Sequence, residues 1–262
     1  MLDQQELAHT ADAFGVTEAQ VRRDHLISHV LLAITELRLP VVFFGGTSLA
    51  RTYLADPNAG GRLSEDIDLY AFDRRAIAST LDADLPRALR REYPGTRWDP
   101  PPGAVRGLDP ARLVTRDGLS LKIQLLNAFD HHELAKWPTE QHSVDLRYSD
   151  LPTHTTMAVP TLASAVGMKT AAWHDRHAPR DLYDLAGLAR QGALTAAAAA
   201  LVEQFYGWTV TPSVFDSLPA MDWVGQLSQQ TRELPDPLGC LVEVREAYGS
   251  ALDWPPPTDP VA

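Results

Sequence analysis

Apolar residues recur at helical spacing through residues 1–39. Four of them form one stripe ahead of Gly15: Leu2, Leu7, Ala11 and Phe14. This pattern predicts an amphipathic helix that ends at Gly15, because glycine readily takes the left-handed conformation that follows a helix. A second helix is predicted from Thr17, whose hydroxyl can accept a hydrogen bond from a backbone N–H of the first turn.

The pattern changes to a short apolar run at residues 41–44, which is typical of a buried strand. Gly45 and Gly46 follow, where the backbone can turn tightly or let a ligand approach closely. Thr47 and Ser48 are favourable N-cap residues, so a helix is expected over residues 49–54. Backbone N–H groups at such a turn can bind an anion such as phosphate.

Polar and apolar residues alternate in the segment that ends at Tyr70. Asp66 and Asp68 share one face of the predicted strand, and Ile67 and Leu69 share the other. Two neighbouring carboxylates repel each other unless a cation lies between them. Oxygen ligands of this kind suit Mg²⁺ (or Mn²⁺), which takes further ligands from water and from substrate phosphates.

Ser64 stands two positions before the first carboxylate, which would place its hydroxyl on the same strand face. We therefore expect Ser64 to lie near a bound nucleotide phosphate. A phosphate group on Ser64 would then block nucleotide binding through charge repulsion.

The middle of the chain combines a helix and a hairpin. Residues 74–91 have apolar residues at helical spacing. Residues 111–115 and 119–126 are predicted to form two antiparallel strands, with Asp117 and Gly118 as the turn. Residues 131–133, His-His-Glu, are a poor metal chelate, because adjacent side chains face different ways.

From residue 159 onward the pattern is helical. Thr161 is expected to cap a helix that contains Lys169, and residues 174–178 are expected to form a polar loop. Pro179 suits the first turn of the next helix, which runs to Arg190. Lysine is a compact point charge suited to a triphosphate, and Asp181 lies near the predicted N-terminus of its helix, where a negative charge is favoured.

Composition narrows the functional classes. The 262 residues are 45% hydrophobic and carry a formal net charge of −11, with Cys240 as the single cysteine. No apolar run approaches the length of a membrane span, so we expect a cytoplasmic protein without an internal disulfide. The acidic charge argues against a broad, non-specific grip on nucleic acid, although it does not exclude a local basic groove.

Two motifs together resemble the AbiEii/AbiGii toxin family of nucleotidyltransferases with a DNA-polymerase-β-like fold. The first is GGTSLARTYL with RLSEDIDLY, and the second is MKTAAWHDRHAPRDLYDLAGL. The resemblance implies a bilobed α/β (α+β) protein. A mixed-sheet domain with N-terminal helices would span residues 1–155, a helical domain residues 156–262, and the active site the cleft between them.

The resemblance also implies the site and the reaction. An acceptor hydroxyl, first of all at the 3′ end of tRNA, would attack the α-phosphate of an NTP, and a cognate antitoxin would be the protein partner. The expected catalytic residues are Asp66, Asp68, Lys169 and Asp181, of which Asp66 and Asp68 would bind the metal. The expected nucleotide-binding residues are Gly45, Gly46, Thr47, Ser48, Ser64 and Arg180.

One position departs from the superfamily pattern. Gln124 stands where a third carboxylate is expected on the strand next to the Asp66–Asp68 pair. Asp145 or Asp181 would supply that ligand, or waters would complete the metal shell. Two other functions remain open from the sequence. The acidic chain suits a polycationic acceptor such as an aminoglycoside, and Gln124 fits an inactive nucleotide- or partner-binding module.

Overall fold

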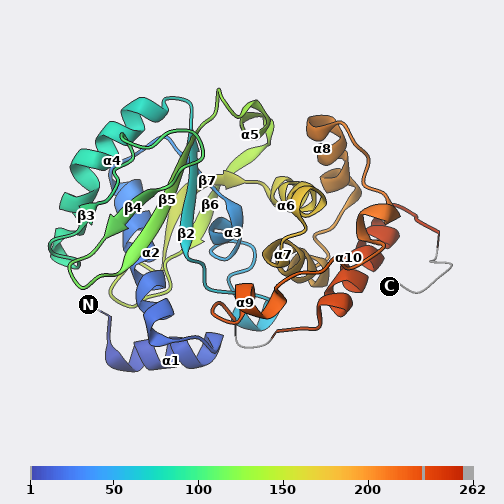
Figure 1. The fold of residues 1–262 in the computed structure, drawn as a ribbon, viewed down its shortest axis with the longest axis horizontal. Coiled ribbons are helices and arrows are strands. Elements are labelled where there is room, and N and C mark those ends of the chain that lie inside the picture. Colours follow the sequence, from blue (N-terminus) through green and yellow to red (C-terminus); the bar gives the residue numbers. More distant parts are fainter. Residues whose placement is uncertain (1, 232–233, 256–262) are drawn as a thin grey trace.

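A seven-stranded mixed sheet crosses the N-terminal part of the chain in the computed structural model, which describes residues 2–231 and 234–255 (Figure 1). The strand order is β3-β4-β5-β2-β1-β7-β6. The β2–β5 and β1–β7 pairs are parallel, and the other neighbours are antiparallel. The strands are β1 (Val42–Phe44), β2 (Asp66–Ala71), β3 (Arg97–Trp98), β4 (Ala111–Val114), β5 (Ser120–Asn127), β6 (Thr139–Asp145) and β7 (His154–Pro160).

Local sequence signals account for the helices on the sheet. Gly15 ends α1 (Gln4–Phe14) with φ +63°, and the Thr17 hydroxyl accepts a hydrogen bond from the N–H of Gln20 at the start of α2 (Glu18–Glu36). A further helix of this part, α4 (Arg74–Ala88), continues into the 3-10 turn η2 (Leu89–Arg91). These helices and the β4–β5 hairpin confirm the sequence predictions for this region.

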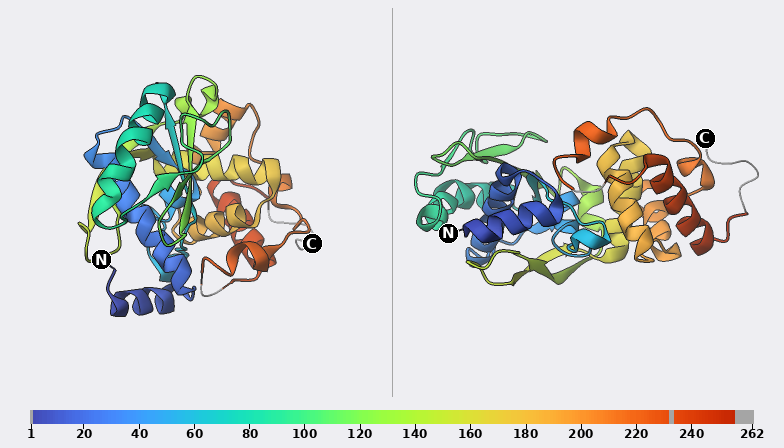
Figure 2. Two further views of the ribbon diagram at one scale, coloured as in Figure 1. Left: turned by 60° about the vertical axis from the view of Figure 1, so that its left-hand side comes forward. Right: turned by 90° about the horizontal axis from the view of Figure 1, so that it is seen from below.

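A bundle of helices follows the sheet along the chain and lies beside it (Figures 1 and 2). Thr161 caps the first of them, and Pro179 occupies the first turn of the second, as predicted. The elements of this part are α6 (Leu162–Arg176), α7 (Pro179–Arg190), α8 (Ala196–Tyr206), η3 (Pro212–Phe215), α9 (Trp223–Leu227) and α10 (Pro237–Ala251).

Each part has its own hydrophobic core. One core lies between the sheet and helices α2 and α4, and it includes Phe43, Ile67 and Leu125. The other lies among α6, α7, α8 and α10, around Trp173 and Tyr248. This arrangement confirms the mixed α/β class. The sheet ends with β7 at Pro160, so the predicted division between residues 155 and 156 falls inside that strand. The division into two domains stays a prediction.

Two helix boundaries differ from the sequence predictions. The helix after β1 is α3 (Gly45–Leu49), which begins at Gly45, so Thr47 and Ser48 lie inside it and do not cap it. Residues 174–176, predicted as loop, extend α6 by a further turn. Two short elements complete the description, η1 (Pro57–Ala59) and α5 (His132–Lys136).

Across residues 2–231 and 234–255, none of the helices combines the length and the apolar character that a membrane span requires.

Candidate active site

The paired carboxylates stand on a central strand of the sheet. β2 lies between β1 and β5, with Asp68 opposite Phe44 on one side and opposite Gln124 on the other. Ile67 and Leu69 are fully buried on the other face of the strand, while Asp66 and Asp68 are half-buried. Burial of the apolar face sets the register, so both carboxylates are held on the same face.

Two glycines let the α3 turn approach these carboxylates. Gly45 has φ +78°, and a Cβ atom at this position would collide with Oδ2 of Asp68. A Cβ atom on Gly46 would lie 2.5 Å from Nη2 of Arg62. The absence of both side chains therefore allows the turn to pack directly against the Asp68 carboxylate and the Arg62 guanidinium.

A cavity of about 480 Å³ opens between the sheet and the helical part. Its sheet-side wall includes five residues from α3, β2 and β5: Gly45, Gly46, Ser48, Asp68 and Gln124. Its helical wall includes four residues from α6 and α7: Met168, Lys169, Arg176 and Asp181. The cavity thus combines an acidic strand, a glycine turn and cationic side chains.

The electrostatics of the carboxylate pair favour a bound cation. Burial and the neighbouring charge of Asp66 raise the pKa of Asp68 to about 6. Burial also raises the pKa of Asp66, against the nearby positive charge of Lys122. Among the residues that the structure describes, no hydrogen-bond donor or ion-pair partner contacts either carboxylate. Four acceptor oxygens without donors fit a hard divalent cation.

A network of ion pairs lies behind the helical wall of the cavity. Nζ of Lys169 lies 3.0 Å from Oδ1 of Asp181 and 2.7 Å from Oδ2 of Asp184. Asp184 also accepts two hydrogen bonds from Arg62, at 2.8 and 3.0 Å. Arg176 donates to both carboxylate oxygens of Asp181, at 2.7 and 3.0 Å. The network joins the segment before β2 to α6 and α7.

Each aspartate in this network is paired with two cations: Asp184 with Arg62 and Lys169, and Asp181 with Lys169 and Arg176. Although burial acts in the opposite direction, Arg62 and Lys169 lower the pKa of Asp184 to about 2. Burial likewise opposes the charges of Asp184 and Asp181, which together raise the pKa of Lys169. Lys169 is therefore a cation whose charge is already neutralised by two aspartates.

The sequence matches the family model "Nucleotidyl transferase AbiEii toxin, Type IV TA system" over residues 29–254. The chain belongs to this family. The match spans most of the chain, including both motifs and the strands and helices that line the cavity. Family membership identifies the chain as a nucleotidyltransferase of a toxin–antitoxin system, an enzyme class that uses nucleoside triphosphates and divalent metal ions. No curated protein matches the chain in sequence.

Solved structures of similar fold agree with this membership. The nucleotidyltransferase toxin MenT4 from Mycobacterium tuberculosis H37Rv superimposes with a TM-score of 0.69 at 17% identity, covering 97% of this chain and 90% of that one. JHP933 from Helicobacter pylori superimposes with a TM-score of 0.55 at 16% identity, covering 91% and 94%. At these identities the likeness concerns the fold.

The predicted site residues divide into two groups. Six of them line the cavity: Gly45, Gly46, Ser48, Asp68, Lys169 and Asp181. Gln124, at the position expected for a third carboxylate, also lines it. Asp66 lies one step along the same strand face as Asp68 but outside the cavity lining. Thr47, Ser64 and Arg180 also lie outside the lining.

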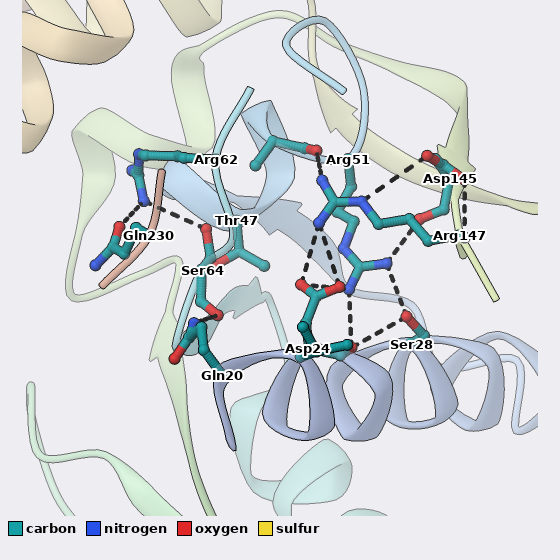
Figure 3. Close-up of polar contacts among 12 residues, drawn as sticks. Gln20, Asp24, Ser28, Thr47, Arg51, Arg62, Ser64, Asp145, Arg147 and Gln230 are labelled. Atoms are coloured by element: carbon teal, nitrogen blue, oxygen red, sulfur yellow. Dashed lines mark hydrogen bonds and ion pairs between the residues drawn. The ribbon is translucent and has the colours of Figure 1, made fainter. Parts of the chain in front are cut away.

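The last three residues make contacts that serve the fold. The Thr47 hydroxyl donates to the carbonyl oxygen of Asp66. Ser64 is 4% exposed, and its hydroxyl accepts from Nη1 of Arg62 at 3.4 Å (Figure 3). β2 begins only at Asp66, so the strand alternation that predicted Ser64 beside the carboxylates does not extend back to it. Arg180 forms an ion pair with Glu65 at 3.4 Å.

The structure narrows the choice of a third metal ligand. Asp145 lies on β6 at the sheet edge, separated from β2 by β1 and β7, and its carboxylate accepts from the N–H of Arg147. Asp181 faces the cavity, but Lys169 and Arg176 bind its carboxylate. Gln124 lies directly beside Asp68, and its Nε2 donates to the carbonyl oxygen of Leu108 at 2.6 Å. The side chains of His132 and Glu133 lie outside the described residues.

Sequence reasoning missed four arginines that shape the site. Arg62 and Arg176 belong to the ion-pair network. Arg62 lies in the first motif and Arg176 in the second, but neither motif indicates that these arginines form ion pairs. Arg51 is 1% exposed and forms an ion pair with Asp24 at 2.9 Å (Figure 3). Arg147 also binds Asp24, at 3.1 Å, and donates to the carbonyl oxygen of Ala50. These contacts fix the residues after α3 against α2.

Proposed function

We propose that this chain transfers a nucleoside monophosphate from an NTP to a hydroxyl group of an RNA acceptor, namely the 3′ end of tRNA. A new bond forms between the acceptor oxygen and the α-phosphorus, and the bond to the leaving pyrophosphate breaks. Family membership supports the reaction class. The observation that carries the proposal for this site is the Asp66–Asp68 pair: Asp68 lines the cavity, Asp66 stands beside it on the same strand face, and neither carboxylate contacts a donor among the described residues.

We assign metal binding to Asp66 and Asp68, with Mg²⁺ or Mn²⁺ as the ion. Such an ion would neutralise phosphate charge and lower the pKa of the attacking hydroxyl. Gln124 lies beside Asp68 in the register, so its side-chain carbonyl oxygen is the neutral candidate for a further ligand. A neutral ligand leaves more net positive charge at the site than a third carboxylate would.

We assign the triphosphate to the space between the glycine turn and the last turn of α6. Gly45, Gly46 and Ser48 line one side, and their backbone can approach phosphate oxygens without hindrance from Cβ atoms at the two glycines. The Arg176 side chain lines the other side and is 60% exposed, so its guanidinium can bind phosphate while still contacting Asp181. Asp181 would hold Arg176 in position through their ion pair, and Lys169, which also pairs with Asp181, would add positive charge next to the phosphates.

An alternative acceptor is a polycationic small molecule such as an aminoglycoside. The net charge of −11 favours this alternative, because an acidic surface attracts a polycation and repels RNA. A protein partner, the cognate antitoxin, is expected from the toxin–antitoxin family, and a cytoplasmic location stays a prediction.

The acceptor can be identified by labelling. Purified protein is incubated with each α-³²P-labelled NTP and Mg²⁺, together with total tRNA in one series and an aminoglycoside in another. Label in intact tRNA, and no label in tRNA whose 3′-terminal diol was oxidised with periodate before the reaction, would support the proposal. Label in the aminoglycoside alone would select the alternative. Asp66→Asn and Asp68→Asn are the controls, and label that persists in both variants would remove the metal assignment.

A further inference from the structure

A cluster of two histidines and two carboxylates lies on a different part of the molecule. His25 and His29 are one turn apart on α2, so their rings share one face of the helix. Asp150 comes from the connection between β6 and β7, and Glu92 directly follows η2. One ligand atom from each of the four residues lies within 4.8 Å of the others.

The separations between these atoms match a metal coordination shell. Nε2 of His25 lies 3.2 Å from Nε2 of His29 and 3.2 Å from Oδ2 of Asp150. Nε2 of His29 lies 3.4 Å from Oδ2 of Asp150. In a tetrahedral Zn²⁺ site with ligands at about 2.0–2.1 Å, neighbouring ligand atoms are about 3.3 Å apart. Three ligand atoms thus already form one triangular face of such a shell.

The surroundings of His25 prepare it to be a ligand. Its Nδ1 is 2.5 Å from the Tyr93 hydroxyl, and the residue is 2% exposed. If Nδ1 donates to Tyr93, the lone pair of Nε2 is directed at His29 and Asp150. Metal-bound histidines are usually fixed in this way through their second ring nitrogen.

We propose that His25, His29 and Asp150 form a binding site for a first-row divalent transition metal, foremost Zn²⁺, with Glu92 or a water molecule as the fourth ligand. Nitrogen donors distinguish this site from the all-oxygen pair Asp66 and Asp68, because imidazole suits Zn²⁺ and carboxylates suit Mg²⁺. His29, Glu92 and Asp150 line a surface cavity of about 310 Å³, which gives an ion access from solvent.

The proposed site is separate from the nucleotide cavity and has a structural role. None of its four residues belongs to the lining of that cavity. A bound ion would join α2, the end of η2 and the β6–β7 connection. The same helix and connection carry Asp24 and Arg147, whose ion pair holds the residues after α3 (Figure 3). Zinc at this position would therefore stabilise the support of the glycine turn without contacting the substrate.

The test measures zinc binding by the full-length protein after removal of metal with EDTA. Calorimetry with Zn²⁺ is performed in excess Mg²⁺, which occupies the Asp66–Asp68 pair. Co²⁺ absorption reports directly on tetrahedral coordination. His29→Gln removes a ligand, and the matched control His9→Gln changes an exposed histidine on α1. Tyr93→Phe removes the acceptor of the His25 hydrogen bond.

We expect one equivalent of zinc, a higher unfolding temperature with zinc, and intense visible bands with Co²⁺. His29→Gln should weaken zinc binding at least about 100-fold and abolish the bands, and Tyr93→Phe should weaken it about tenfold or more. His9→Gln should behave as the wild type. If His29→Gln fails to fold, Asp150→Asn provides the same test from a partly exposed ligand.

Two results would overturn the proposal. The first is zinc binding that His29→Gln and Asp150→Asn leave unchanged. The second is no binding above the background level, which would show that shared protons alone hold the two imidazoles and Asp150 together. Both results are independent of the nucleotidyl-transfer assay, so failure of the zinc site would leave the proposed reaction intact.

Discussion

Gly45 shows how a single residue without a side chain determines the site. Its φ of +78° and the closeness of the Asp68 carboxylate both exclude a Cβ atom. We predict that Gly45→Ala lowers nucleotidyl transfer about 100-fold or more, because displacement of a metal ligand by about 1 Å is enough for such a loss. Gly207→Ala is the matched control, since Gly207 has φ +75° and nothing within 4 Å of the added atom.

Both glycine variants should lose about 1 kcal/mol of stability from the left-handed backbone, as measured by urea unfolding. Only Gly45→Ala should lose transfer activity. Equal activity in the two variants would contradict the close packing of the turn against Asp68.

The raised pKa of Asp68 predicts how stability and metal binding depend on pH. Burial and Asp66 raise its pKa from 3.8 to about 6 in the folded protein. A raised folded-state pKa means that this group stabilises the metal-free fold below about pH 4, and that this contribution is lost as the pH rises through 6. Metal binding has the opposite dependence, because the ion requires the ionised carboxylate.

We therefore predict that Mn²⁺ affinity, measured by calorimetry, rises about tenfold per pH unit up to pH 6 and then levels off. In Asp66→Asn the like charge is absent, so the Asp68 carboxyl group should titrate at lower pH in an NMR experiment. A pH-independent affinity between about pH 5 and pH 7 would contradict this description of the pair.

Residue types and strand alternation were sufficient to predict the carboxylate pair, because the buried partners Ile67 and Leu69 set the face on which the pair stands. They were not sufficient for Ser64. The strand signal gives no information on where β2 begins, and the chain before Asp66 instead turns so that Ser64 contacts Arg62. Because the Ser64 hydroxyl is buried, phosphorylation there requires the chain around it to open, and the phosphorylation switch stays a prediction.

At the scale of elements, one ion pair joins the segment before β2 to α7. Arg62 and Asp184 are 122 positions apart in sequence, and both are almost fully buried. We predict that Arg62→Leu destabilises the protein by about 3–5 kcal/mol in urea unfolding, because Asp184 then remains as a buried charge with fewer partners. The double variant Arg62→Leu/Asp184→Leu should recover part of this loss.

The control for this ion pair is Arg190→Leu, since the Arg190–Glu243 pair is at least one-third exposed on both sides. Exposed pairs contribute about 0–1 kcal/mol, so this variant should remain close to the wild type. Equal losses in Arg62→Leu and Arg190→Leu would show that the buried network does not hold α7 in place.

The elements that sequence predicted well are those with local signals. Capping residues, Gly15 and the Asp117-Gly118 turn defined α1, α2, α6 and the β4–β5 hairpin, since each depends on nearby residues. The five-residue α3 has no side-chain cap, and tertiary contacts with Asp68 and Arg62 specify it. The ion-pair network joins residues far apart in sequence, so no periodic pattern indicates it.

At the scale of the whole molecule, the cavity lies between two separate cores. The sheet core holds β2 and its carboxylates, and the helical core holds α6 and α7 with their charged residues. The ion pairs among Arg62, Lys169, Asp181 and Asp184 connect these parts. Residues of the helical wall can therefore affect both stability and catalysis, and the two effects must be measured together.

Lys169 and Arg176 separate these two effects. Lys169 is buried between Asp181 and Asp184, whereas the Arg176 side chain is 60% exposed and contacts Asp181 from the cavity. The motif alone predicts Lys169 as a triphosphate ligand, whose loss would weaken triphosphate binding far more than folding. The two ion pairs instead predict that Lys169→Met lowers stability by about 3–5 kcal/mol along with activity, because two buried carboxylates lose their shared cation.

Arg176→Met should lower stability by only about 1 kcal/mol, because Lys169 still pairs with Asp181 and the arginine is largely solvated. It should raise KM for the NTP at least about tenfold, since a charge-assisted contact to phosphate is lost. Urea unfolding and NTP kinetics on both variants decide the assignment. An unchanged KM in Arg176→Met, together with full stability in Lys169→Met, would contradict this assignment. Lys169 would then be the triphosphate ligand, and Arg176 would only pair with Asp181.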